Sequence, residues 1–406
     1  MRRLVVLALV LGLATASLAS PEGCGVCHGR ERVLHRDSIH AEADVGCVAC
    51  HGGDPAHAES KADAHAAAAG YRGRVTRRDV PEVCGTCHAD VARMRPFALR
   101  TDVLAVYRTS HHGTAVLEQG RLDAAVCTDC HGTHDVLRTK DARSPAFRVN
   151  VPATCGRCHG DAALMSAHGL DTRAPEEFAG SVHGQRLAEG APGVPSCADC
   201  HDAHAAAPPG AQEVADVCGH CHVETRDRFR ESPHAAASAS GAMEQCVTCH
   251  GNHAVGQPDF DRFDQVSTED DGTGARCLDC HAGDGGEKVA REFGAGFRNA
   301  DTLLRRARGQ IDAMAASGFY ADDERESLSR AERELVRAVP LSHTVDAARI
   351  EGSLRRVRSL VDEALLGREK RLRDARDRRI YGSVGGALLL GIAWFMALWR
   401  RKVRGR

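Results

Sequence analysis

The segment that decides the fold reads Cys127-Thr-Asp-Cys130-His131-Gly-Thr-His134. Two cysteines separated by two residues and followed directly by a histidine form the C-x-x-C-H signature for attachment of c-type haem. The two thiols form thioethers with the vinyl groups of the haem. The adjacent histidine is then held under the ring, where its imidazole binds the iron.

The same signature occurs nine times and uses all 18 cysteines of the 406-residue chain. A zinc ribbon also uses C-x-x-C, but it does not need a histidine at the fifth position of every copy. A disulfide framework would give varied spacings, and a thioredoxin-like motif is expected once, in a βαβ pattern that we do not find in the sequence. We therefore predict nine covalent haems c with their iron.

The predicted attachment residues are Cys24, Cys27, Cys47, Cys50, Cys84, Cys87, Cys127, Cys130, Cys155, Cys158, Cys197, Cys200, Cys218, Cys221, Cys246, Cys249, Cys277 and Cys280. The predicted proximal iron ligands are His28, His51, His88, His131, His159, His201, His222, His250 and His281.

Aromatic residues make up only 4% of the chain, which is low for a protein with a large side-chain core. Nine porphyrins would supply the missing apolar surface, so we expect folding to depend on the haems, as small metal-binding domains depend on their metal. The formal net charge is −2, with an acidic cysteine-rich part followed by a mildly basic part. Neither part has the clustered basic face that indicates a nucleic-acid partner.

Most of the remaining histidines belong to two patterns that recur along the chain as an internal repeat. An aromatic-x-x-Ser-x-His pattern precedes haem motifs in three copies, and a fourth copy has a histidine in the aromatic position. Three other histidines extend a motif to C-x-x-C-H-x-x-H. Such a histidine lies only three residues past a proximal ligand, so we expect it to bind a neighbouring haem. The predicted distal ligands are His40, His112, His183 and His234 from the first pattern, and His134, His204 and His253 from the second.

The repeat occurs four times after a lone first haem at Cys24, and its first copy departs from the pattern. No histidine follows His51 at the usual offset, so His57 or His65 would replace it. His343 would supply the ninth distal ligand. We interpret His35, His111, His168 and His220 as non-ligands. For each predicted ligand, the alternative is an ordinary surface or hydrogen-bonding histidine.

The two ends of the chain indicate export and anchoring. Residues 1–19 have two arginines, an apolar run and small residues, which is typical of a secretory signal peptide; the alternative is an N-terminal membrane anchor. Tyr381–Trp399 has 19 residues and no charge, and its length of about 28 Å is close to the roughly 30 Å hydrocarbon core of a bilayer. The alternative is a buried core helix. The basic tail at 400–406 should stay in the cytoplasm.

These features predict five regions. They are a signal peptide at 1–19, a nine-haem domain at 20–286 built from a lone haem and four two-haem modules, a helical stalk at 287–380, a transmembrane helix at 381–399 and a cytoplasmic tail at 400–406. The fold class is mostly α and irregular, with little regular structure around the haems and a helical hairpin or stalk after them.

Apolar residues at helical spacing predict three helices after the haem motifs, roughly Lys288–Ser317, Asp322–Val339 and Thr344–Ile380. Gly318 and Pro340 would separate them, and Asp322 or Asp323 would cap the second. We expect the last helix to continue into the membrane-spanning segment.

The run from Cys47 to Cys277 resembles the exported multihaem c cytochromes of the cytochrome c3 family. The resemblance lies in C-V-A-C-H-G-G-D-P (47–55), C-T-D-C-H-G-T-H (127–134), N-V-P-A-T-C-G-R-C-H (150–159), S-V-H-G (181–184), V-C-G-H-C-H (217–222), S-P-H (232–234) and C-V-T-C-H-G-N-H (246–253). It implies low-spin haems with two histidine ligands, favours His65 over His57, and makes Ser342-His343-Thr344 look like a ligand-bearing turn.

Two hypotheses for function follow. Members of this family are typically electron carriers of anaerobic respiratory chains, which implies a periplasmic, membrane-anchored carrier between a membrane quinol-oxidising partner and periplasmic or outer acceptors. The alternative is a reductase of nitrite, hydroxylamine or a sulfur oxyanion, which needs one open haem with acid–base and cationic residues around it. We expect no catalytic residue in the first case.

Overall fold

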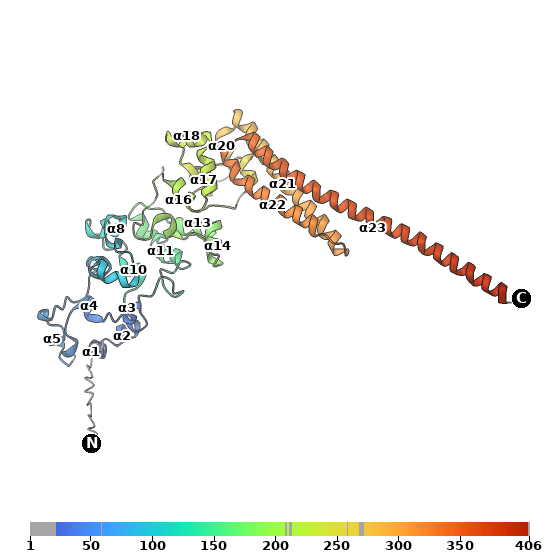
Figure 1. Cartoon of the computed structure of the whole chain (residues 1–406). Helices are drawn as coiled ribbons and strands as arrows, with labels where there is room; N and C mark the ends of the chain where they lie inside the picture. The colour runs from blue at the N-terminus through green and yellow to red at the C-terminus, as the bar shows by residue number, and fades with distance from the viewer. Residues whose placement is uncertain are drawn as a thin grey trace, which may run out of the picture. The chain divides into compact units, whose positions relative to one another are not determined.

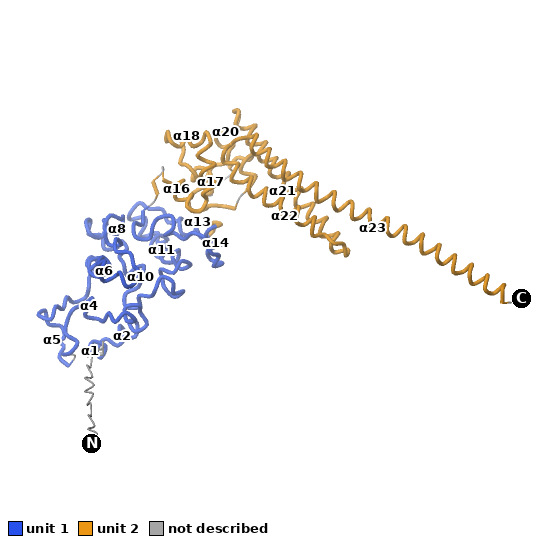
Figure 2. The backbone as a smooth tube through the Cα atoms, viewed as in Figure 1, with its two compact units in different colours: residues 1–179, 183–208 blue, residues 180–182, 209–406 orange. Residues whose placement is uncertain are grey.

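The computed structural model describes residues 22–404, apart from residues 58, 208, 211–212, 258 and 268–271. The predicted signal segment at 1–19 lies outside the described residues. The described part of the chain contains α-helices, short 3-10 helices and irregular loops, and it contains no strand (Figure 1). The fold class expected from the sequence is therefore confirmed. The chain divides into two compact units, residues 1–179 with 183–208 and residues 180–182 with 209–406 (Figure 2).

Short helices separated by loops make up residues 22–208. They are α1 (Glu22–Cys27), α2 (Gly29–Arg36), α3 (Ile39–Glu42), α4 (Cys47–His51), η1 (Pro55–His57), α5 (Lys61–Ala64), η2 (Ala67–Ala69), α6 (Val80–His88), α7 (Val91–Met94), η3 (Arg95–Phe97), α8 (Val103–Thr109), α9 (His111–Leu117), α10 (Cys127–His131), α11 (Val151–His159), α12 (Ala162–Ser166), α13 (Ala174–Gly180), α14 (Val182–Ala188) and α15 (Cys197–His201).

Residues 209–404 begin with short helices and end with three long ones. They are α16 (Val214–Gly219), α17 (Val223–Arg230), α18 (Pro233–Ala239), α19 (Gln245–His250), η4 (Phe260–Phe263), α20 (Cys277–His281), α21 (Gly285–Ala316), α22 (Asp322–Leu341), η5 (Ser342–Thr344) and α23 (Ala347–Arg404). The three long helices pack against one another.

Five haem motifs form short helices of five or six residues, namely α4, α10, α15, α19 and α20, and the residue after the histidine ends several of them. The motifs in α6 and α11 end longer helices, and the first and seventh motifs extend past the ends of α1 and α16. Gly52 and Gly251 follow their motifs with φ of 67° and 69°. In both places a Cβ would lie 1.9 Å from a backbone carbonyl oxygen, of Gly70 and Gly272 respectively. Glycine is needed here because only a residue without Cβ fits such an approach at positive φ. The turn directs the following loop away from its own histidine.

The three long helices enclose the main side-chain core of the chain. This core lies in the bundle of α21, α22 and the first part of α23, and its buried members include Phe297, Leu304, Ile311, Leu328, Leu335, Leu354, Val357 and Val361. By contrast, the buried cluster beside α6 and α10 consists of Val80, Val116 and Val126. The bundle can therefore be stabilised by hydrophobic burial alone, whereas the haem-motif region has little apolar side chain of its own to bury.

The boundaries of α22 differ from the expectation. Asp322 is the first helical residue, and the N-cap residue Ala321 makes no side-chain capping bond, so the prediction that Asp322 or Asp323 caps this helix is wrong. Acidic residues in the first turn still interact favourably with the helix dipole. Pro340 lies inside the last turn and does not end the helix before it. Gly318 has φ of 86° and follows α21, as expected.

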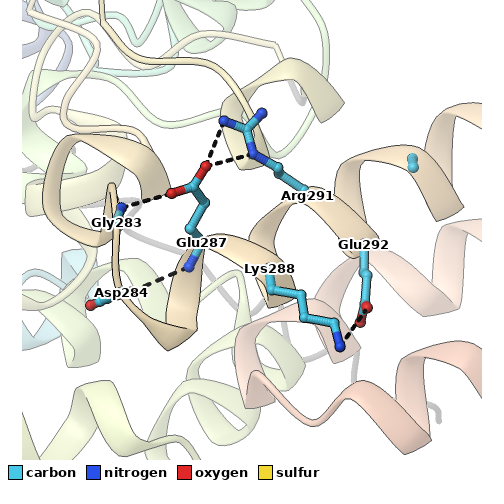
Figure 3. Close-up of a pocket in the computed structure, with 7 residues that line it drawn as sticks. Gly283, Asp284, Glu287, Lys288, Arg291 and Glu292 are labelled. Carbon is cyan, nitrogen blue, oxygen red and sulfur yellow. Dashed lines mark hydrogen bonds and ion pairs between the residues drawn. The ribbon is translucent and has the colours of Figure 1, made fainter.

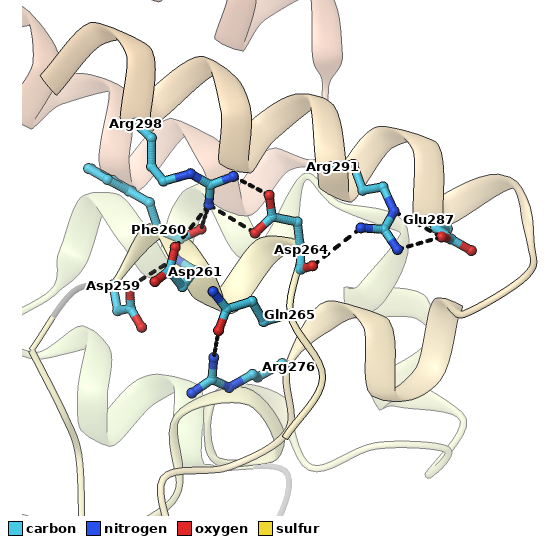
Figure 4. Close-up of polar contacts among 9 residues, drawn as sticks. All are labelled: Asp259, Phe260, Asp261, Asp264, Gln265, Arg276, Glu287, Arg291 and Arg298. Carbon is cyan, nitrogen blue, oxygen red and sulfur yellow. Dashed lines mark hydrogen bonds and ion pairs between the residues drawn. The ribbon is translucent and has the colours of Figure 1, made fainter. Parts of the chain in front are cut away.

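Arg298 of α21 forms ion pairs that hold the short helix η4 against α21. Arg298 donates to Asp261 Oδ1 at 3.0 Å and to both carboxylate oxygens of Asp264, and it also reaches the carbonyl of Phe260 (Figure 4). This pairing holds the pKa of Asp264 below its ordinary value. The rings of Phe297 and Phe260 also stack, with their centroids 4.9 Å apart. The bundle is thereby joined to the loop that follows α19.

The last helix, α23, is continuous for 58 residues. It contains a segment that is long and apolar enough to cross a membrane, with a mean hydropathy of 1.7 and none of it buried. Where α23 passes the end of the bundle, Arg371 donates to the buried Glu324 at 2.5 Å. From Ala347 to Tyr381 the helix runs about 50 Å before the apolar segment starts.

We predict that Phe297→Ala destabilises the bundle by about 3–5 kcal/mol, because it removes a fully buried ring. Urea unfolding of the haem-loaded protein, followed by helical circular dichroism, measures the loss. Val336→Ala is the control: Val336 is 69% exposed on α22, so its change should stay within about 0.5 kcal/mol. Equal effects of the two substitutions would contradict the assignment of this core.

Candidate metal centres

The serine of the Ser-x-His pattern has a structural role that explains why it recurs. Ser110 is 3% exposed, donates to the carbonyl of Tyr107 at 2.7 Å and accepts from the amide of Gly113 at 2.9 Å. It ends α8 and caps α9, which places His112 in the first turn of the new helix. Ser38 caps α3 before His40 in the same way, and Ser232 donates to the carbonyl of Phe229 at 2.6 Å.

The predicted ligands face one another in pairs. Each pair joins a proximal histidine of a motif to a predicted distal histidine, with ring centroids 5.9–6.3 Å apart. The pairs are His28 with His65, His88 with His40, His51 with His134, His159 with His112, His131 with His204, His281 with His234, and His250 with His343.

This separation fits one metal ion between two imidazoles. Two metal–nitrogen bonds of about 2.0 Å each, with about 1.1 Å from each nitrogen to its ring centre, bring the centroids about 6 Å apart. A direct ring contact is shorter, as between His65 and Tyr71 at 4.5 Å. The angle between paired ring planes varies from 12° to 66°, which such a site permits because each ring can rotate about the metal–nitrogen axis. The residues therefore fit the iron of a haem with two histidine ligands.

Burial keeps several of these imidazoles neutral. Burial is the main cause that lowers the pKa of His40, His112, His131 and His204. It also lowers the pKa of His250 to about 4, and the neighbouring His343 makes the second-largest contribution to that shift. A histidine whose pKa is lowered below 6.5 is uncharged at pH 7 and keeps a lone pair for a metal.

The two candidates of the first repeat behave differently. His65 lies beside His28, and its Nδ1 contacts the carbonyl of Lys61 at 2.8 Å. His57 is exposed, and its Nδ1 bonds the carboxylate of Asp54 at 2.8 Å, which raises the pKa of His57. The structure therefore brings His65, and not His57, to a proximal histidine.

In two extended motifs, the second histidine lies opposite a proximal histidine from earlier in the sequence. His134 follows His131 by three residues but lies opposite His51, and His204 lies opposite His131. His343 comes from η5 between α22 and α23 and lies opposite His250. The helical region therefore contributes a side chain to one of the pairs.

The remaining predicted ligands are His183, His201, His222 and His253. His183 lies in α14, and His201 ends α15 with its Nδ1 3.2 Å from the carbonyl of Ala207. Of the expected non-ligands, His35 contacts the carbonyl of Val45 at 2.9 Å and His168 bonds Asp123 at 2.6 Å.

Cysteines of successive motifs lie close together. All eighteen are within the described residues, and none is in a disulfide. The thiols of Cys84 and Cys127, of Cys155 and Cys197, and of Cys218 and Cys246 are in hydrogen-bonding contact, and those of Cys24 and Cys47 also meet. The helices of these motifs pack in the same combinations, α6 with α10, α11 with α15 and α16 with α19, and α10 also contacts α11.

Two charged residues near the motifs, Arg262 and Asp284, were not predicted from the sequence. Arg262 donates to the carbonyl of Cys249 at 2.7 Å and to that of Thr273 at 3.1 Å, so it lies between the eighth and ninth motifs. Asp284 bonds Nδ1 of His281 at 2.9 Å. A signal for Asp284 exists, because it stands three residues after the proximal histidine, where other motifs carry their second histidine. Nothing in the sequence marks Arg262.

Comparison with known proteins gives one match. Residues 39–160 match the family model described as cytochrome c3, and this segment contains four of the C-x-x-C-H motifs. Neither the curated proteins nor the solved structures include a match. The family match, the motifs and the facing histidines together support a multihaem c-type cytochrome that binds haem covalently.

Proposed function

We propose that this protein is a membrane-anchored cytochrome with nine haems that carries electrons outside the cytoplasm. The observation that carries the proposal is the pairing of fourteen predicted ligands across gaps that fit one iron. His183, His201, His222 and His253 complete the set of ligands. Each such pair of imidazoles would hold one iron from both sides and would leave no ligand position for a substrate.

The chemistry is one-electron exchange. Each haem, when bound, supplies an iron that alternates between the ferric and ferrous states. The chain contributes the two thioether cysteines and the two imidazoles, which hold the iron in the same coordination in both states. Burial lowers the pKa of His40, His112, His131, His204 and His250, so these five imidazoles would add no charge to their sites.

The order of the motifs supports a path along the chain. Cysteines of the first and second, third and fourth, fifth and sixth, and seventh and eighth motifs approach each other. The amide of Ala275, just before the ninth motif, donates to the carbonyl of Thr248 in the eighth at 2.7 Å. Within each of these groups of motifs, neighbouring haems would then lie close enough for electrons to pass between them.

The C-terminal helix supports anchoring and also sets the distance from the membrane. His343 lies in η5, just before α23, and about 50 Å of α23 separates Ala347 from Tyr381. The anchor alone would not bring these haems to the lipid. A quinol-oxidising membrane partner would therefore have to extend along the stalk, and periplasmic or outer proteins would accept the electrons. The signal peptide and the basic tail favour a periplasmic position for the haems and a cytoplasmic C-terminus.

The choice between His65 and His57 tests the ligand assignment. We predict that His65→Ala opens one iron and produces a high-spin signal in electron paramagnetic resonance of the oxidised protein. His57→Ala is the matched control and should leave the spectrum unchanged, because His57 bonds Asp54 instead. A high-spin signal in His57→Ala, with none in His65→Ala, would reverse the assignment.

The absence of a substrate position predicts how the reduced protein reacts. Anaerobic mixing with nitrite, hydroxylamine or sulfite should leave the absorption of the ferrous haems unchanged over minutes, whereas a one-electron acceptor such as ferricyanide should oxidise all of them. Oxidation by nitrite or hydroxylamine at a rate that saturates with concentration would support a reductase instead.

Removal of the apolar segment tests the anchor. A chain that stops at Ile380 should be released as a soluble, haem-loaded protein, because the exposed apolar residues of α23 are then gone. Membrane fractionation of the two forms measures this, with the full chain as control. If the shortened chain still sediments with membranes, another segment or a partner provides the attachment.

A further inference from the structure

The second ring nitrogen of the predicted ligands has different partners. Four of them place Nδ1 beside a backbone carbonyl: His51 beside Gly73 at 3.2 Å, His65 beside Lys61 at 2.8 Å, His201 beside Ala207 at 3.2 Å and His343 beside Pro340 at 3.2 Å. His281 differs, because its Nδ1 bonds the carboxylate of Asp284 at 2.9 Å.

We propose that Asp284 is a positioning residue that lowers the reduction potential of the haem bound at Cys277 and Cys280. The inference rests on the proposed electron-transfer function, because it requires a haem there with His281 and His234 as ligands. It would make this haem a weaker electron acceptor than it would be if Nδ1 of His281 faced a backbone carbonyl.

The local structure holds Asp284 in one orientation. Its Oδ1 accepts from the amides of Gly286 at 2.6 Å and Glu287 at 3.3 Å, which caps α21. Figure 3 shows the bond from the Glu287 amide to Asp284. The other carboxylate oxygen, Oδ2, is 2.9 Å from Nδ1 of His281. A Cβ on residue 286 would lie 2.5 Å from Nδ1 of His281, so the glycine there leaves room for the ring.

A carboxylate partner makes the imidazole a stronger donor. A ligand histidine that gives its second N–H to a carboxylate is more basic than one that gives it to a carbonyl. A more basic ligand favours the ferric over the ferrous iron, and hydrogen bonding to the ligands is one way in which proteins set haem potentials. Gain of an electron by this haem would need no proton transfer at His281, because the Nδ1 proton would remain in the bond with Asp284.

Because this haem would be bound at the last motif, a lower potential there would affect the direction of electron flow. His281 ends the last motif, and Asp284 caps the helix that leads into the bundle. A lower potential at this haem would favour transfer of an electron from it to the haems of the preceding motifs. The bond between His281 and Asp284 would thus favour electron flow from the bundle side of this unit towards the earlier motifs.

The chain contains a matched comparison for Asp284. Asp54 also follows a proximal histidine, His51, by three residues. Its side chain turns to His57, and Nδ1 of His51 contacts the carbonyl of Gly73. Asp54 thus has the same chemistry and the same offset as Asp284 but no bond to a predicted ligand.

Redox titration of the full-length, haem-loaded protein tests the proposal, with each haem followed by absorption and by electron paramagnetic resonance. Asp284→Asn keeps an oxygen that can cap the helix but removes the charge facing His281. We expect the reduction equilibrium constant of one haem to rise about tenfold, which is 59 mV for a one-electron couple, together with a shift of one low-spin signal. Asp54→Asn and Glu287→Gln are the controls, and each should change every constant less than twofold.

Two results would overturn the inference. Unchanged potentials in Asp284→Asn, with nine low-spin haems still present, would reject the role of Asp284 and leave the proposed function intact. An equal shift in Glu287→Gln would show that nearby charge, and not the bond to His281, sets the potential. If the last motif holds no low-spin haem in the unmutated protein, the proposed function fails together with this inference.

Discussion

The fold of the haem-motif region depends on the approach of two imidazoles to about 6 Å, the distance at which one iron can join them. Each such pair connects segments that are far apart in the chain, as His131 and His204 do. The described side chains beside α6 and α10 form only a small buried cluster around Val80, Val116 and Val126. Iron coordination and thioether bonds would therefore replace the hydrophobic core that holds together a protein of ordinary composition.

The bundle of α21, α22 and α23 depends on a different interaction, because it has its own apolar core. It is nevertheless joined to the haem motifs at several points. His343 lies opposite His250, Arg349 of α23 pairs with Glu231 at 2.5 Å, and Asp284 both caps α21 and bonds His281. These contacts fix the end of the long helix to the last motifs. The helical part thus also supports the last haem motifs.

Local patterns in the sequence predicted much of the fold. The three long helices follow from apolar spacing, and the mostly α, irregular fold class was expected for a chain organised around haems. Partners across a gap could not be predicted, because they depend on the path of the whole chain. His57 and His65 illustrate this: position alone left both as candidates and only the family resemblance favoured His65, whereas in the structure Asp54 binds His57 three residues away. The missing cap of α22 shows the same limit, since Asp322 begins the helix instead of preceding it.

The central claim is that the paired histidines bind haem iron from both sides and leave no iron open. Low-temperature electron paramagnetic resonance of the oxidised, unmutated protein, with the spins counted against total iron, tests it most directly. We predict nine low-spin ferric irons per chain and no high-spin signal. A high-spin signal that accounts for one iron or more would contradict the claim and indicate an open haem.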